Sequence, residues 1–168
     1  NSATGQFLSF GAMTALPTFG TAGTNEFSEG SRLLNKSYEL SKAGKEAESK
    51  QHISQSIEQF KEAVRLDPNN AQAHEALASA HVQNGDVVNA RQSYTNAFEA
   101  AQRTGNAEAK VSAHGAIERL NASEALKAKD NAKALVHANR AYEIDPNNIN
   151  NELSLANALD ANNRGKEA

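Results

Sequence analysis

The chain of 168 residues contains no cysteine and no tryptophan, and only 5% of its residues are aromatic. The absence of cysteine excludes disulfide frameworks, thiolate metal sites and cysteine nucleophiles. With so few aromatic side chains, a core must be built from Ala, Leu, Val and Ile, which suits closely packed helices better than a β-sandwich. The length fits one domain of ordinary size or a short array of repeats.

Charge of neither sign dominates, since 17 Lys and Arg residues stand against 20 Asp and Glu, a formal net charge of -3. Such a balance creates no long-range field that would gather nucleic acid or anionic lipid. No apolar run approaches the roughly 18 residues that a membrane-spanning helix needs. We therefore expect no nucleic-acid partner and no transmembrane segment.

Residues 1–30 differ from the rest of the chain in being rich in Gly, Thr, Ser and Phe and poor in charge, which predicts an extension outside the helical part. This extension holds four of the six phenylalanines: Phe7, Phe10, Phe19 and Phe27. A solvated linker should avoid such side chains. The extension is therefore expected to dock on a protein surface, the alternative being a disordered or trimmed leader. Its apolar stretch 7–19 is broken by Gly11 and Pro17, yet it resembles the remnant of an export signal and favours an exported or periplasmic location over the cytoplasm.

From residue 31 onward, apolar residues recur at three- and four-residue steps, which predicts helices. Within this part AVRLDPNN at 63–70 is matched by AYEIDPNN at 141–148. Pro68 and Pro146 lack an amide hydrogen and disfavour helical geometry in the preceding residue, so each should end a helix. The asparagines that follow can cap the next helix, because an Asn side chain accepts a hydrogen bond from an amide of the first turn.

The segments around these prolines resemble the tetratricopeptide repeat. In the unit 37–70 the matching positions are Leu40, Ala43, Gly44, Ala47, Ser56, Phe60, Ala63 and Pro68. In the unit 71–104 they are His74, Leu77, Ala78, His81, Ala90, Tyr94 and Ala97, with a turn at Gly85 and Asp86. Gln102 stands where the family usually has proline, so the second helix of this unit should continue toward the break at 104–106.

A third unit, 107–148, matches the pattern at Asn121, Ala122, Ala125, Ala134, Ala138 and Ala141. About ten extra residues fall around 105–114 when repeats of about 34 residues are counted back from Pro146. We therefore expect an elongated first helix in this unit. Residues 149–168 match half of a fourth unit, so the repeat domain is predicted to span residues 31–168.

The resemblance implies an all-α, right-handed solenoid of antiparallel helix pairs, about three and a half repeats long, whose first helices line a concave groove. Members of the family mostly use this groove to hold a polypeptide segment, so the chain is expected to be a scaffold or adaptor and not an enzyme. The residues expected in the groove are Ser41, Lys45, Glu48, Gln72, Glu75, Ser79, Gln83, Arg119, Ser123 and Asn157. Their mixed character predicts a polar groove without a dominant charge, and for each residue the alternative is an ordinary solvated helix position.

One subtype of the family clamps a partner's C-terminal carboxylate with Lys and Asn side chains, because a carboxylate is bound well by charge-assisted hydrogen bonds. Here the corresponding places hold Ser41, Glu75, Ser79 and Arg119. The clamp is absent, so binding of chaperone tails is not expected.

No catalytic or phosphate-binding motif occurs in the sequence, so we expect no catalytic residue and no cofactor. Two pairs have helical spacing, His74 with His81 and His114 with Glu118, and each invites a metal-binding or acid–base reading. The places of His74 and His81 normally carry large packing side chains, so partly buried rings are favoured over a metal or small-ligand site. His52 and His137 are expected on the surface.

Self-association is a competing hypothesis, because the half repeat leaves Leu153, Leu155 and Leu159 without a following helix. Either the Phe-rich extension of the same or a neighbouring chain covers them, or two copies stack their ends. A third possibility is that the natural protein continues beyond residue 168.

Overall fold

A computed structural model describes residues 22–167, which contain seven α-helices and no strand. The helices are α1 (Thr24–Lys42), α2 (Glu46–Leu66), α3 (Ala71–Gln83), α4 (Val87–Thr104), α5 (Ala107–Lys127), α6 (Asn131–Ile144) and α7 (Ile149–Glu167). The all-α prediction is confirmed. None of these helices is both long and apolar enough to cross a membrane. Residues 1–21, most of the predicted extension with Phe7, Phe10 and Phe19, lie outside the described part.

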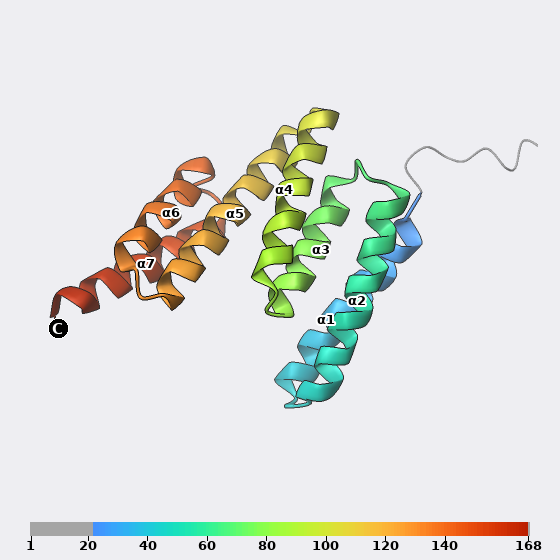
Figure 1. Cartoon of the computed structure of the whole chain (residues 1–168), viewed down its shortest axis with the longest axis horizontal. Coiled ribbons are helices and arrows are strands. Elements are labelled where there is room, and N and C mark those ends of the chain that lie inside the picture. Colours follow the sequence, from blue (N-terminus) through green and yellow to red (C-terminus); the bar gives the residue numbers. More distant parts are fainter. Residues whose placement is uncertain (1–21, 168) are drawn as a thin grey trace, which may run out of the picture.

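Consecutive helices form pairs that follow one another along the long axis of the molecule (Figure 1). Helices α1 and α2, α3 and α4, and α5 and α6 make the three pairs, and α7 packs on α6 and α5. The first helix of each pair also contacts the first helix of the next, so α1, α3, α5 and α7 form one continuous row. This arrangement is the predicted solenoid of helix pairs.

The repeated DPNN motif ends one helix and begins the next at both of its occurrences. Helix α2 ends at Leu66 and α6 at Ile144, each two residues before a proline. The side chain of Asn70 then accepts a hydrogen bond from the amide of Ala73 at 3.1 Å, and that of Asn148 accepts one from Asn150 at 2.9 Å. Each DPNN motif thus contains both the predicted end of one helix and the predicted cap of the next.

The other helix boundaries also follow local chemistry. Asp86 caps α4 by accepting a hydrogen bond from the amide of Asn89 at 3.1 Å. Helix α4 continues through Gln102 to Thr104 and ends at Gly105, whose φ of 68° is a conformation that glycine adopts without strain. Helix α5 begins directly after this turn, at Ala107, and is one of the two longest helices.

The start of the first helix differs from the prediction, because α1 begins at Thr24 and not after residue 30. Residues 24–30 therefore belong to the first helix pair, and Phe27 packs its ring 5.9 Å from the ring of Phe60. Gly30, at the predicted boundary, lies inside α1 and permits close contact, because a Cβ there would lie 2.7 Å from the Phe60 ring. The sequence alone does not distinguish a glycine that permits close packing from a glycine that ends a helix, because the residue packed against it comes from another helix.

The core changes character along the solenoid. In the first three helices Ile53, Ile57, Phe60 and Leu77 are buried together. In the last three helices the buried cluster consists of alanines, with leucines packed at its edge: Ala122, Ala125, Ala134, Ala138 and Ala158, with Leu126, Leu135 and Leu155. Leu155, expected to be uncovered, is therefore partly covered.

Enlarging a buried alanine should destabilise the solenoid. Ala97 of α4 is 0% exposed, so Ala97→Leu should cost about 1–3 kcal/mol because the added atoms have no space. The melting temperature should fall by about 2–4 °C per kcal/mol, measured by circular dichroism. Ala132→Leu, at an exposed position of α6, is the matched control and should change it little. Equal melting temperatures for the two variants would show that close helix contact at Ala97 is not required.

Candidate functional site

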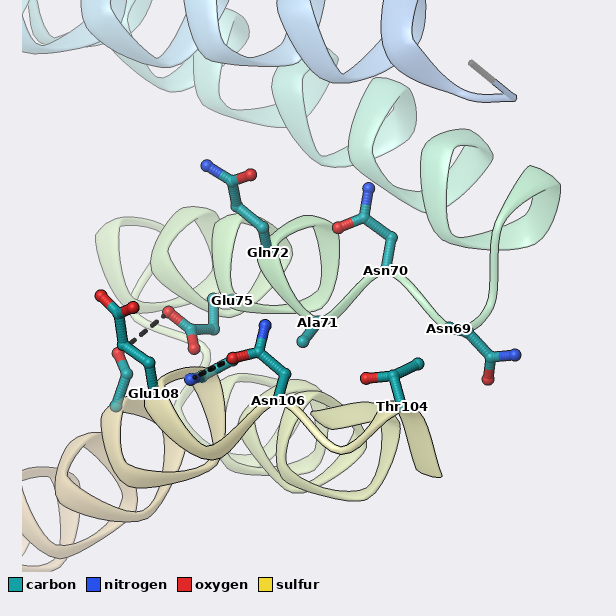
Figure 2. A pocket seen from close by; sticks show the side chains of 10 residues that line it. Asn69, Asn70, Ala71, Gln72, Glu75, Thr104, Asn106 and Glu108 are labelled. Carbon is teal, nitrogen blue, oxygen red and sulfur yellow. Dashed lines mark hydrogen bonds between the residues drawn. The ribbon is translucent and has the colours of Figure 1, made fainter. Parts of the chain in front are cut away.

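The row of first helices carries a hollow between α3 and α5, with a volume of about 510 Å³ (Figure 2). Its lining residues are Asn69, Asn70, Ala71, Gln72, Glu75, Thr104, Asn106, Glu108, Ala109 and Ser112. Two of them, Glu75 and Glu108, are acidic and none is basic. We call this the acidic hollow.

Both helices begin at the edge of the acidic hollow. Asn70 caps α3, and Asn106 caps α5 by accepting a hydrogen bond from the amide of Ala109 at 3.0 Å. Deeper in the hollow, the Ser112 hydroxyl donates a hydrogen bond to Glu75 Oε2 over 3.2 Å. Burial raises the pKa of the Glu75 carboxyl, while this hydrogen bond and the charge of Arg119 oppose the rise. The carboxylate is thus partly desolvated, and a further cationic neighbour would stabilise it.

A second hollow, of about 280 Å³, lies between α5 and α7. Its lining residues are Arg119, Ser123, Leu126, Asn150, Leu153, Ser154 and Asn157. It combines one cation with two leucines, and Leu153 is 57% exposed. We call this the basic–apolar hollow.

Arg119 is held in place from α7. Its Nη1 donates a hydrogen bond to Asn151 Oδ1 at 2.5 Å, and Asn151 Nδ2 donates to the carbonyl oxygen of Asp145 at 3.0 Å. A Cβ on Gly115 would lie 3.3 Å from the Asn151 amide, so the glycine makes room for this contact. Burial lowers the pKa of the Arg119 guanidinium, opposed by Tyr94 and Glu75. The basic–apolar hollow therefore contains a cation of defined position.

Seven of the ten residues predicted for the groove line one of three hollows. Gln72 and Glu75 line the acidic hollow, and Arg119, Ser123 and Asn157 line the basic–apolar hollow. Ser41 and Gln83 line a third hollow, of about 330 Å³, where α1, α2 and α3 meet.

The other three predicted residues lie outside these hollows. Ser79 is half-buried, with its hydroxyl 3.4 Å from the Tyr94 hydroxyl on α4. Lys45 and Glu48 lie at the start of α2, where their charged groups are 3.9 Å apart. Both residues thus belong to the start of the second helix of the first pair, and their expected place in a groove stays a prediction.

Glu108 and Ser112 are site residues that the repeat pattern did not indicate. They lie in the first two turns of α5, within the stretch that exceeds the usual repeat length. The insertion was visible in the sequence, but its side chains have no counterpart in the pattern. The contribution of Leu153 and Ser154 depends on how α7 packs against α5, which no local signal specifies.

The histidines serve packing in the described structure. His74 and His81 are 8% and 7% exposed, and His74 Nε2 lies 2.9 Å from the carbonyl oxygen of Pro68. Within residues 22–167, no three His, Asp or Glu side chains come close enough to hold a metal ion. The predicted buried rings are thus observed.

One further histidine prediction needs correction. His137, expected on the surface, is only 15% exposed at its side chain, and its Nδ1 lies 2.7 Å from Glu118 Oε2. Glu118 therefore joins α5 to α6. It does not pair with His114, which packs edge-on against Phe98 with ring centroids 5.9 Å apart.

Comparison with known proteins identifies the repeat. Residues 48–85 match the family model described as TPR repeat, a stretch that runs from the first turns of α2 to just beyond α3. Among solved structures, the chain is similar to the first TPR of Spaghetti (RPAP3) bound to the HSP90 peptide SRMEEVD, with 18% identity and a TM-score of 0.46. That similarity covers 80% of this chain and 94% of the other. A search of curated proteins finds no match.

The stability of the solenoid should depend on the protonation of His81. Burial lowers the pKa of this ring, Asp86 opposes the shift and Lys61 adds to it. The unfolded chain then binds the proton more readily, so this contribution is complete above about pH 6.5 and is lost as the pH falls below it. His81→Leu removes the ring that takes up the proton, so it should reduce the fall in melting temperature between about pH 7.5 and 5.5. Leucine is chosen because it occupies the equivalent position, Leu159, of the last unit.

His52 bonds the carbonyl oxygen of Glu48 within its own helix, which makes His52→Leu the control. This variant should retain the pH dependence of the parent chain. If His81→Leu and the parent lose stability in parallel over this range, the ring at 81 is not the responsible group.

Proposed function

We propose that this chain, in which residues 48–85 match the TPR repeat model, binds a segment of another polypeptide in a groove along α3, α5 and α7 and acts as a non-catalytic scaffold or adaptor. The observation that carries the proposal is the pair of adjoining hollows, the acidic and the basic–apolar, which share α5. An extended segment lying along this helix would contact both.

The exposed groups of the groove suit recognition of a main chain. Gln72, Ser123 and Asn157 are exposed in the hollows and carry amide or hydroxyl groups. Such groups both donate and accept hydrogen bonds, so they match the alternating amides and carbonyls of an extended peptide. The half-buried Glu75 carboxylate lies where the carboxylate-clamping subtype requires a donor, so it would repel a C-terminal carboxylate. The proposed partner segment is therefore not an acidic chain terminus.

Peptide ligands selected from a random library on the full chain provide the test. Gln72→Arg places a cation in the acidic hollow and Asn157→Glu places an anion in the basic–apolar hollow, and each should weaken binding of the selected peptides by at least about tenfold. Isothermal titration calorimetry measures the loss.

The chain offers matched controls on the second helices of the pairs. Gln92 of α4 and Asn139 of α6 are exposed, so Gln92→Arg and Asn139→Glu make the same chemical changes away from the two hollows. They should leave the affinity within about twofold. Selected peptides that bind all four variants equally well, or a selection that enriches none, would refute the groove as the binding site.

Self-association is a second candidate function, supported by the uncovered face of α7. Helices α3 and α7 each follow a DPNN turn, so each residue of α3 has an equivalent on α7. The exposure of a residue on α3 can therefore be compared with that of its equivalent on α7. On α3, Ala71, Ala78 and His81 are 6%, 0% and 7% exposed. On α7, Ile149 is 72% and Leu159 45% exposed, and Ala156 is exposed too. We propose that this 168-residue chain pairs with a second copy through these residues.

The oligomeric state should respond to charge on this face. Ile149→Lys combined with Leu159→Lys should convert a dimer to a monomer, measured by light scattering after size-exclusion chromatography, because lysine is costly to bury in an apolar contact. Val88→Lys with Val136→Lys is the control, since these valines are 75% and 47% exposed on α4 and α6. A parent chain that is monomeric over its accessible concentration range would exclude the pairing.

A further inference from the structure

The two hollows along α5 differ in charge, and this difference specifies what the groove accepts. We infer that the partner segment carries a lysine or arginine for the acidic hollow and, about six residues away, an aliphatic residue beside an aspartate or glutamate for the basic–apolar hollow. The inference rests on the proposed function and adds to it the chemistry and spacing of the ligand.

A cation suits the acidic hollow better than an anion. The side chains of Asn70 and Asn106 already accept hydrogen bonds from first-turn amides of α3 and α5. Fewer free N–H groups therefore remain at these helix N-termini to bind an anion. Glu75 is half-buried with one hydrogen bond from Ser112, and Glu108 is exposed at the rim. A Lys or Arg side chain would bring donors to both carboxylates and satisfy their remaining lone pairs.

The basic–apolar hollow has the opposite preference. Leu126 and the 57% exposed Leu153 face the same space as Arg119. An aliphatic side chain would remove both leucines from water. Arg119 is fixed by its hydrogen bond to Asn151, so it offers a positioned cation to a neighbouring carboxylate at little cost in side-chain entropy.

The spacing follows from the geometry of one helix. The α5 residues that line the acidic hollow are Glu108, Ala109 and Ser112, and those that line the other hollow are Arg119, Ser123 and Leu126. The two groups are centred about 13 residues apart, or about 20 Å at 1.5 Å per residue. An extended peptide covers this distance in about six residues.

The sequences of peptides selected on the full chain test the inference. Library members long enough to reach both hollows should be enriched in Lys or Arg about six residues from Leu, Ile or Val, with Asp or Glu adjacent, in one chain direction. A repeat of the selection on Glu108→Lys should replace the basic residue by an acidic one, since the rim charge is reversed. Glu108 is exposed, so this variant should fold like the parent, which circular dichroism checks.

Glu99→Lys, at an exposed position of α4, is the control and should select the parent's pattern. For one enriched peptide, Lys→Glu should weaken binding to the parent chain by at least about tenfold and restore it to Glu108→Lys. Peptides that lose affinity on Gln72→Arg but show no basic residue at this spacing would overturn the inference and leave the proposed function intact. A selection that enriches no groove-binding peptide would overturn both.

Discussion

Close approach of neighbouring helices at alanine is the constraint on which this structure depends. Ala90 and Ala97 of α4, and Ala134 and Ala138 of α6, are all 0% exposed. Side chains this small let two helix backbones lie near each other, so the pairs α3–α4 and α5–α6 are stabilised by many short contacts instead of a few large side chains. Among the large apolar side chains of the described residues, Phe60 is the most deeply buried, at 1% exposed. The row of first helices depends on this close packing of the pairs.

Directional polar contacts complement this apolar packing in the second half of the chain. Arg91 of α4 bonds Asn121 and Glu124 of α5. Asn151, 1% exposed, links Arg119 to the backbone of the second DPNN turn. A core of alanines has little shape to define how one helix lies on the next, whereas a hydrogen bond requires its partners within a narrow distance and angle. The Arg119 network therefore positions α7 and presents a cation to the groove at the same time.

The elongated α5 gives the groove its asymmetry. Its first turns bring Glu108 and Ser112 to the α3 side, where Glu75 lies, while its last turns bring Leu126 to the α7 side. One helix thus carries both hollows at a fixed separation, because an α-helix is stiff and its rise per residue is constant. The extra residues of the third unit, which exceed the usual repeat length, include Glu108 and Ser112 of the acidic hollow.

The sequence by itself determined the features that depend on neighbours along the chain. Helix ends at Leu66 and Ile144, and the caps of Asn70, Asp86 and Asn148, follow from proline and short polar side chains acting within a few residues. The alanine positions indicated the paired helices in the same way. Only the tertiary structure decided the role of Gly30 against Phe60, the burial of His137 on Glu118, and the meeting of Glu75 with Ser112. Those contacts join different helices, and the distance between two helices is set by packing that no single segment contains.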